Sequence, residues 1–238
     1  WLKDYLPVLR NASNFCFNLI DPDIKMINAP GSLMIDVFVR ANYTSDSNGM
    51  MVSFLDDFAQ VEDAVGDSKK ATLLRKMSKE MAMAMNTYLW ANQSSGSDHY
   101  ITQLDLDLST IRDFVDYDAN LIAAYAGVPS AARAQALFAR IDAGTCSAKK
   151  GGGPQWVSEK YYGPKDTLNG NIGDSRCSMG RIAWFDAHAR KRYSQEYSKE
   201  YSKEESQEYT QEYTQEYSKE KDREQFSSSA RTSSLDLF

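Results

Sequence analysis

Two amphipathic segments joined by a two-residue link constrain the fold of this chain more than any other feature. From Met50 to Val65, apolar residues recur at i, i+4, i+8 and i+11, which is the spacing of one face of an α-helix. A second such face runs from Leu74 to Leu89, and the link Gly66-Asp67 predicts an antiparallel helical hairpin. The two faces consist of Met50, Met51, Phe54, Leu55, Phe58, Val61 and Val65, and of Leu74, Met77, Met81, Met85, Tyr88 and Leu89.

Polar residues and glycine predict where these two helices begin and end. Asp46 or Ser47 can cap the start of the first helix, and Gly66 can end it. Asp67 or Ser68 can then cap the start of the second.

Four further segments have helical spacing, which gives six helices, or three hairpins, and an all-α fold. Pro7 limits where the first of these segments can become helical, or kinks it. Gly127 ends the second and Ser130 caps the third. The four segments cover residues 2–20, 118–126, 130–141 and about 175–192.

Long polar loops separate the hairpins, at residues 35–48, at 98–118 and around Trp156. Alternating apolar and polar residues from His99 to Leu104 predict a small β-hairpin inside the second loop. Loops longer than about 12–15 residues in a compact domain are usually functional or disordered. The aromatic and carboxylate residues of these loops favour a function.

Composition excludes some classes of protein. Hydrophobic residues make up 42% of the 238 residues, enough for a core in the first part of the chain. The net charge of −6 argues against nucleic-acid binding, and no apolar run approaches the roughly 18 residues that a membrane span needs. From Tyr193 to Glu220 a Tyr-Ser/Thr-x-Glu-like tetrapeptide is repeated seven times. Residues 193–238 are therefore expected to be a low-complexity tail, solvated or a single helix, outside a domain of residues 1–192.

One carboxylate, Glu159, lies between a tryptophan and two tyrosines on the third loop. A carboxylate beside aromatic rings suits sugar chemistry, because it can act on a water molecule or an acetal oxygen while ring faces hold the pyranose. The alternative is that Glu159 is a solvated surface acid with no special role.

The cysteines and glycosylation sequons bear on the cellular compartment. The three cysteines lack metal-ligand spacing. Cys146 and Cys177 flank the Glu159 loop and are either joined in a disulfide or free, packed thiols. With three Asn-x-Ser/Thr sequons they weakly favour the secretory pathway. The sequons begin at Asn11, Asn42 and Asn92.

Several segments together resemble the six-hairpin glycosidases related to trehalase and processing α-glucosidase. The likeness covers about residues 1–192. It is carried by TSDSNGMMVSFL (44–55) with the later VEDAVGD, by MNTYLW (85–90) before DHYITQLD, and by SEKYYGPKDTLNGNIGDS (158–175). The resemblance implies an (α/α)6 barrel, glycoside hydrolysis, Glu159 as the catalytic base, and no cofactor or metal.

The resemblance also implies a deficit, because a full barrel has about twelve helices. Since the chain begins at Trp1 rather than Met, the six helices are expected to be its incomplete, C-terminal half. Asp36 and Asp46 are the internal candidates for the general acid, and helix capping is the alternative role for Asp46. No carboxylate stands at Arg40-Ala41-Asn42, where one is expected.

Aromatic, acidic and amide side chains are expected to bind the sugar. Asp116 and Asp118 suit hydrogen bonds to hydroxyl groups, although Asp118 can instead cap the helix that follows. His99 and His188 are assigned no role. The expected sugar-binding residues are Trp156, Tyr161, Tyr162, Asp116, Tyr117, Asp118 and Asn171.

The sequence therefore predicts a domain that binds carbohydrate and hydrolyses a glycosidic bond. In the inverting geometry, the base and the acid stand roughly 6.5–9.5 Å apart to admit a water molecule. The alternatives are a degenerate barrel that binds glycans without hydrolysis, and a helical protein-interaction scaffold. A repeat solenoid is disfavoured, because the hairpins do not resemble one another and their loops are long. The oligomeric state is left open.

Overall fold

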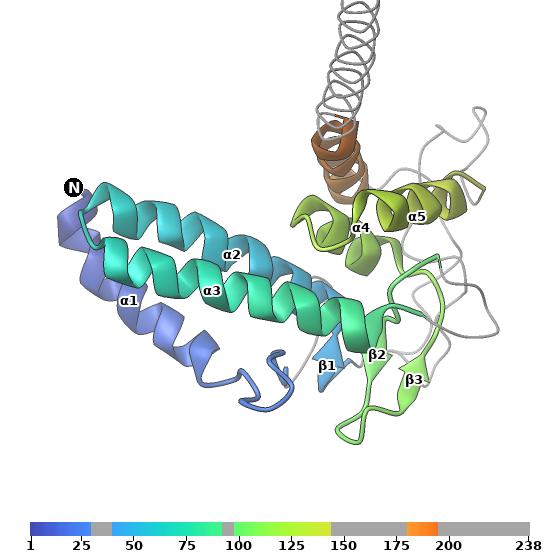
Figure 1. The fold of residues 1–238 in the computed structure, drawn as a ribbon, viewed down its shortest axis with the longest axis horizontal. Helices are drawn as coiled ribbons and strands as arrows, with labels where there is room; N and C mark the ends of the chain where they lie inside the picture. The colour runs from blue at the N-terminus through green and yellow to red at the C-terminus, as the bar shows by residue number, and fades with distance from the viewer. Residues whose placement is uncertain (30–39, 92–97, 144–179, 195–238) are drawn as a thin grey trace, which may run out of the picture. The chain divides into compact units, whose positions relative to one another are not determined.

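The computed structural model describes residues 1–29, 40–91, 98–143 and 180–194. Within these ranges the chain is mostly helical, with six helices and one small antiparallel sheet (Figure 1). The predicted helical fold is confirmed; that the helices form the incomplete half of an (α/α)6 barrel stays a prediction. The elements are α1 (Leu2–Phe17), β1 (Tyr43–Thr44), α2 (Ser45–Ala64), α3 (Ser68–Ala84), the π-helical turn η1 (Met85–Leu89), β2 (Gln103–Leu104), β3 (Thr110–Arg112), α4 (Tyr117–Tyr125), α5 (Ala131–Ala143) and a helix over 180–194.

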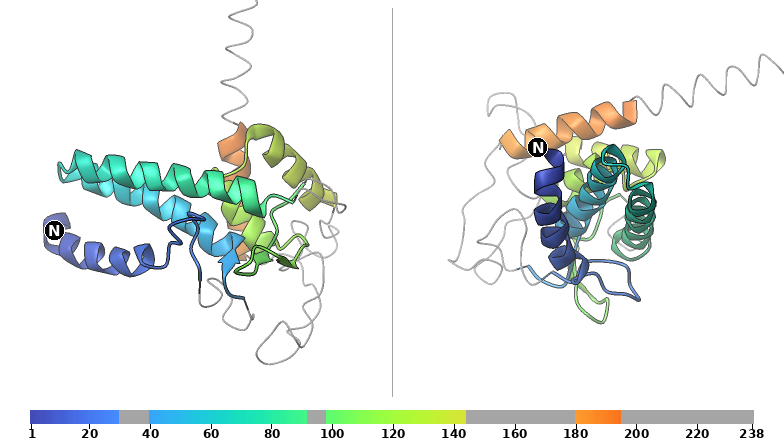
Figure 2. Two further views of the ribbon diagram at one scale, coloured as in Figure 1. Left: turned by 60° about the horizontal axis from the view of Figure 1, so that its bottom comes forward. Right: turned by 90° about the vertical axis from the view of Figure 1, so that its left-hand side faces the viewer.

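The hairpin of α2 and α3 confirms the prediction made from the two apolar faces. Val65 closes α2, and Gly66 follows it with a φ of 88°, a left-handed conformation that glycine adopts without strain. Asp67 caps α3, since its carboxylate accepts a hydrogen bond of 3.1 Å from the backbone N–H of Lys70. The two helices lie side by side along their length (Figures 1 and 2).

The start of α2 differs from the prediction that Asp46 or Ser47 caps it. The helix begins at Ser45, and the cap position is Thr44, whose side chain makes no capping bond. Thr44 has extended backbone angles (φ −113°, ψ 144°) because it also ends β1. The strand therefore fixes the boundary, and Asp46 lies inside the first helical turn.

The apolar faces of α2 and α3 form the centre of the core. Leu55, Leu74, Met81 and Met85 are at most 1% exposed, as the helical spacing predicts. Tyr88 departs from the prediction with 36% of its surface exposed. It lies in η1, where the wider π-helical turn moves side chains off the face that an α-helix would give.

Helix α4 crosses α2 at very close range. A Cβ atom at Gly49 would lie 3.0 Å from Cγ2 of Ile122 and 3.1 Å from the backbone nitrogen of Ala123. Gly127 follows α4 with a φ of 79°, and the Ser130 hydroxyl accepts a 3.4 Å hydrogen bond from Arg133 N–H at the start of α5. The predicted end of one helix at Gly127 and the predicted cap of the next at Ser130 are both confirmed.

The sheet has the order β1-β2-β3 and is antiparallel throughout. Tyr43 pairs with Leu104, and Gln103 pairs with Arg112. The small β-hairpin predicted in the second loop is confirmed, although its first strand begins at Gln103 rather than at His99. The strand β1 was not predicted, because it is only two residues long and occurs inside a segment that reads as loop.

Helix α1 is joined to the hairpin by ion pairs and packs apolar side chains against the core. It begins at Leu2, so Pro7 lies inside the helix and does not set its start. Leu6 is buried, and the Arg10 guanidinium reaches Glu62 of α2, with Nε 2.9 Å from Oε1. Lys70 lies 3.4 Å from the same carboxylate. Glu62 thus joins α1 to the hairpin.

Glu62 gives this joint a pH dependence. Hydrogen bonding to Arg10 holds the pKa of the buried Glu62 carboxyl below its ordinary value of 4.5. The stabilisation of the folded state by the ionised Glu62 carboxylate is therefore complete above about pH 4.5. It is lost as the pH falls from there through the lowered pKa of the folded state. We expect Glu62→Gln to lower the free energy of unfolding by roughly 1.5–3 kcal/mol at pH 7, and by less at lower pH. Urea titrations at pH 7 and pH 3.5 measure this difference.

The matched control for this prediction is Glu80→Gln. Glu80 forms an i, i+4 pair with Lys76 at 3.7 Å on the exposed side of α3. Such a pair contributes about 0.3–0.5 kcal/mol, so Glu80→Gln should change little at either pH. If the difference between Glu62→Gln and the native protein is the same at both pH values, the role assigned to Glu62 is wrong.

Candidate functional site

The predicted site residues divide into two groups. Asp46, Asp116, Tyr117 and Asp118 are described, and the fold brings them together at the starts of α2 and α4. The remaining predicted residues lie outside the described ranges, and so do Cys146 and Cys177. Those site residues are Asp36, Trp156, Glu159, Tyr161, Tyr162 and Asn171.

A buried arginine joins the first turn of α2 to the first turn of α4. Arg40 places one terminal nitrogen 2.9 Å from Oδ2 of Asp46 and donates the other to Oδ2 of Asp116. The three side chains are at most 1% exposed. Two carboxylates and one guanidinium are thus held together away from water, where an ion pair depends on close, complete hydrogen bonding.

Each of these two carboxylates also accepts a backbone hydrogen bond. Oδ1 of Asp116 accepts from the N–H of Ala119 at 2.9 Å, which makes Asp116 the cap of α4. Oδ1 of Asp46 accepts from the N–H of Ser47 at 2.8 Å. Both carboxylates therefore lie where the peptide dipoles at a helix start favour negative charge.

A second arginine extends the arrangement to the helix over 180–194. Arg181 forms a two-point pair with Asp118, with Nε 3.0 Å from Oδ1 and a terminal nitrogen 2.6 Å from Oδ2. Hydrogen bonding to Asp118 raises the pKa of the Arg181 guanidinium above its ordinary value. The alternative role of Asp118 as a helix cap is wrong, because Asp116 occupies that position.

We call Arg40, Asp46, Asp116, Asp118 and Arg181 the helix-start cluster. Two asparagines beside it were missed by the sequence interpretation. Asn48 Nδ2 donates to the Thr44 carbonyl at 2.8 Å, and Asn120 Nδ2 donates to the Asp116 carbonyl at 3.0 Å. In both helices the asparagine stands four residues after the cap residue and donates a hydrogen bond to its carbonyl. The sequence motifs Thr-x-x-x-Asn and Asp-x-x-x-Asn could therefore have indicated these two asparagines.

The same two asparagines fasten neighbouring segments to the helix starts. Oδ1 of Asn48 accepts a 2.6 Å hydrogen bond from the N–H of Ile27. Oδ1 of Asn120 accepts a 2.7 Å hydrogen bond from the N–H of Tyr100. Tyr117, predicted to contact sugar, is 1% exposed and packs inside the domain. The carboxylates of the cluster are therefore buried in a closely packed, hydrogen-bonded surrounding.

Two hydroxyl groups at the start of α2 retain unused hydrogen-bonding capacity. The hydroxyl oxygens of Thr44 and Ser45 are buried, and neither has a hydrogen-bond partner within the described ranges. Buried hydroxyl groups normally find a partner, such as a protein group or an ordered water molecule. These two hydroxyl groups directly precede Asp46 in the sequence, so unused polar capacity lies at the start of α2.

The imidazole of His99 is held between two carboxylates beside the sheet. Nδ1 lies 2.9 Å from Asp98, and Nε2 lies 2.8 Å from Asp113. One terminal nitrogen of Arg140, a residue of α5, donates to both carboxylate oxygens of Asp98, at 2.9 and 3.0 Å. His99 is fully buried, so this network fastens the sheet to α5. In the described ranges, no group of histidine, cysteine and acidic residues is arranged to hold a metal ion.

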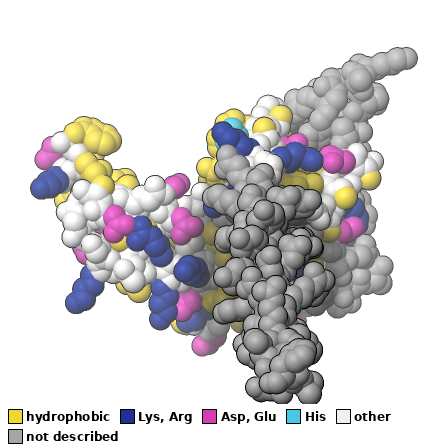
Figure 3. All heavy atoms as spheres, turned by 45° about the horizontal axis from the view of Figure 1, so that its top comes forward, with side chains coloured by type: hydrophobic (Ala, Val, Ile, Leu, Met, Phe, Trp, Pro, Cys, Tyr) yellow, Lys and Arg dark blue, Asp and Glu magenta, His cyan; other side chains and the backbone are white. Residues whose placement is uncertain are grey.

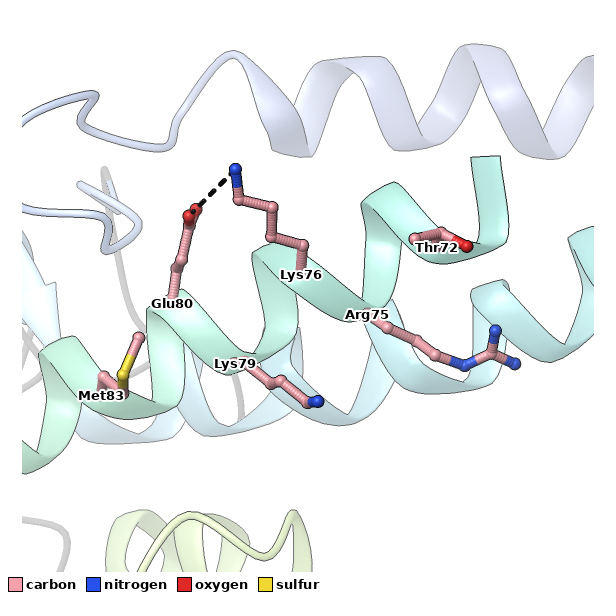
Figure 4. A pocket seen from close by; sticks show the side chains of 6 residues that line it. All are labelled: Thr72, Arg75, Lys76, Lys79, Glu80 and Met83. Carbon is pink, nitrogen blue, oxygen red and sulfur yellow. Dashed lines mark ion pairs between the residues drawn. The ribbon is translucent and has the colours of Figure 1, made fainter. Parts of the chain in front are cut away.

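A shallow groove runs along the exposed face of α3 (Figure 4). Its acidic residue Glu80 is paired with Lys76, and Arg75 is paired with Asp63. It lies on a different part of the hairpin from the helix-start cluster and is not a candidate for sugar hydrolysis. The groove is lined by Thr72, Arg75, Lys76, Lys79, Glu80 and Met83.

Comparison with known proteins adds no relative to this chain. No protein-family model matches it, and no curated protein matches it. Each helix in the described ranges is too short or too polar to cross a lipid bilayer. The functional argument therefore depends on the cluster and on the residues that lead into it.

Proposed function

We propose that this chain is a glycoside hydrolase-like domain whose site lies at the helix-start cluster. The observation that carries the proposal is the meeting of Asp46, Asp116 and Asp118 at the starts of two helices from distant parts of the sequence, held by Arg40 and Arg181. Acid–base hydrolysis of an acetal needs carboxylates that are held in fixed positions on either side of the bond to be broken.

Chain connectivity relates the two undescribed candidate acids to this cluster. The segment 30–39, which contains Asp36, ends directly before Arg40. The segment 144–179, which contains Glu159, ends directly before Gly180 and Arg181. Four residues of chain span at most roughly 14 Å, so Asp36 stays within that reach of Arg40. Each of the two segments is thus followed directly in the sequence by residues of the cluster or of its helix.

The proposed catalytic roles come from the resemblance to the six-hairpin glycosidases, and the supporting roles from burial and pairing. Glu159 acts as the base that activates water, and Asp36 or Asp46 acts as the acid. Of these two, the Arg40 ion pair gives Asp46 a positioning role and favours Asp36 as the acid. Asp116, Tyr117 and Asp118 are buried, so they support the site by fixing Arg40, Arg181 and the adjoining loops. The sugar-binding residues Trp156, Tyr161, Tyr162 and Asn171 belong to the Glu159 loop.

The test is hydrolysis of a panel of disaccharides and nitrophenyl glycosides by the full chain. We expect release of a monosaccharide or of nitrophenol from one class of substrate, measured by chromatography or absorbance. Binding to a glycan array without release from any substrate would favour the second candidate below. Neither binding nor release would overturn the proposal.

The second candidate is a degenerate barrel that binds glycans without hydrolysis. It is favoured by one observation: Asp46, Asp116 and Asp118 are all ion-paired to arginine, which suits structural support better than proton transfer. A helical scaffold that binds protein is a third reading, but the dissimilar hairpins give it no repeated surface.

A further inference from the structure

Two carboxylates meet the imidazole ring of His99 from different parts of the chain. Nδ1 lies 2.9 Å from Oδ1 of Asp98, and Nε2 lies 2.8 Å from Oδ1 of Asp113. The ring is fully buried, whereas the two carboxylate side chains are 29% and 31% exposed. Asp98 directly precedes His99, and Asp113 belongs to the segment that leads into α4. The ring therefore joins two segments that are distant in sequence.

The number of protons on the ring decides whether both contacts are hydrogen bonds. A neutral imidazole has one N–H and one nitrogen that can only accept, whereas an imidazolium donates from both nitrogens. An ionised carboxylate can only accept. With a single N–H, one carboxylate oxygen would face a bare ring nitrogen at 2.8–2.9 Å with no proton between them. The imidazolium is the form of the ring that satisfies both contacts.

The charges around the ring also balance in that form. One terminal nitrogen of Arg140 donates to both oxygens of Asp98, so two cations then face the two anions Asp98 and Asp113. Burial raises the pKa of the Asp98 carboxyl, but hydrogen bonds from His99 and Arg140 outweigh burial and hold that pKa below its ordinary value of 3.8. A neutral ring would leave one negative charge without a counter-charge beside a buried group, which is unfavourable.

The other hydrogen bonds around the ring come from neutral groups. The carbonyl of His99 accepts from the N–H of Ala91 at 2.9 Å, and the next backbone N–H donates to Asn120 of α4 at 2.7 Å. The Thr102 hydroxyl donates to the carbonyl of Phe114 at 3.0 Å. These bonds do not depend on the charge of the ring. Within the described ranges, the charged groups that contact the ring are the two carboxylates.

We propose that His99 is a pH-dependent switch, held as an imidazolium at lower pH, which releases Asp113 when it loses a proton as the pH rises. Asp98 adjoins His99 in the chain and is bound by Arg140. The contact that opens is therefore the one to Asp113, which lies on a separate segment.

Release of Asp113 loosens the approach to the helix-start cluster. Asp113 stands three residues before Asp116, which caps α4 and binds Arg40. The switch therefore acts on the start of α4, and the neutral bond between Thr102 and Phe114 limits how far the segment moves. Its effect on turnover rests on the function proposed above, whereas its effects on protonation and stability do not.

Nitrogen-15 NMR of the full chain with labelled histidine tests the protonation at pH 7.5. An exposed histidine is mostly neutral at this pH, because its ordinary pKa is about 6.5. Both ring nitrogens of His99 should nevertheless have the chemical shift of an N–H nitrogen. The chain has two histidines, and His188 is the internal control, since it is exposed and a histidine is visible at the surface in Figure 3. His188→Gln assigns the signals. A His99 ring with a single N–H at pH 7.5 overturns the proposal.

Urea titrations at pH 6 and pH 8.5 test the switch itself. A proton that the folded state holds and the unfolded state releases makes stability fall as the pH rises, so the native midpoint should be lower at pH 8.5. Asp113→Asn should shrink this fall, because an asparagine amide can donate to a neutral ring. Asp107→Asn is the matched control: Asp107 is an exposed acid between β2 and β3, and the variant should behave like the native protein.

The comparison between these proteins isolates His99 from the other groups that titrate in this range. His188, the terminal amine and the cysteines are the same in all three proteins. An equal fall of the midpoint in the native protein and in Asp113→Asn overturns the switch. Neither measurement uses a substrate, so both are decided whether or not the chain hydrolyses a glycoside.

Discussion

Replacing Arg40 with alanine is expected to lower the free energy of unfolding by about 3–5 kcal/mol. The variant would leave Asp46 and Asp116 buried and close together without their shared counter-charge. The carboxylates cannot turn to water, because each also accepts a backbone hydrogen bond at its own helix start. Urea unfolding at pH 7, followed by circular dichroism, measures the loss.

Two further variants separate this effect from the simple removal of an arginine. Arg75→Ala removes an ion pair with Asp63 in which both side chains are at least 40% exposed, and it should cost less than about 1 kcal/mol. Arg40→Lys keeps the charge but cannot bridge two carboxylates as a planar guanidinium does, so an intermediate loss is expected. Equal, small losses for Arg40→Ala and Arg75→Ala would show that Arg40 is not the link between α2 and α4.

Replacing Glu159 with glutamine is the second large effect that we expect, and it concerns turnover. Glutamine has nearly the same shape but cannot take a proton from water. On the substrate identified in the panel, kcat should fall by roughly 10²–10⁴-fold, while the thermal transition stays unchanged. Initial rates at saturating substrate measure this effect directly.

The matched control is Asp166→Asn, which neutralises another acid of the same loop. If Glu159 is the base, Asp166→Asn should keep most of the native turnover. Unchanged turnover in Glu159→Gln would contradict the role of Glu159, whereas equal losses in both variants would point to a general effect of charge on the loop.

The sequence predicts elements well where the signal is local. The α2–α3 hairpin follows from apolar spacing together with Gly66 and Asp67, and each of these features depends on residues within a few positions of one another. The caps of α2 and α4 were harder to place. Several acidic and hydroxyl residues compete at each start, and a two-residue strand decides the first case.

The helix-start cluster could be predicted only in part. Asp46 was singled out as a candidate acid or helix cap, and Asp116 and Asp118 as acids beside aromatic residues, and all of these are local properties. Arg40 was missed, because its partner Asp116 lies 76 positions away and nothing near Arg40 indicates that the two meet. Arg181 was missed for the same reason, since its partner Asp118 is 63 positions away.

The π-helical turn at Met85–Leu89 has a consequence for how the α3 segment tolerates changes in length. A π turn holds one more residue than an α turn, so η1 is equivalent to a single-residue insertion in a continuous helix. The extra residue determines where Asn86 points, and Asn86 bonds to the Val128 carbonyl and to the hydroxyl of Tyr100. Deleting one residue here would preserve a helix while rotating Asn86 away from both partners, so at this point the register of the chain matters more than its helicity.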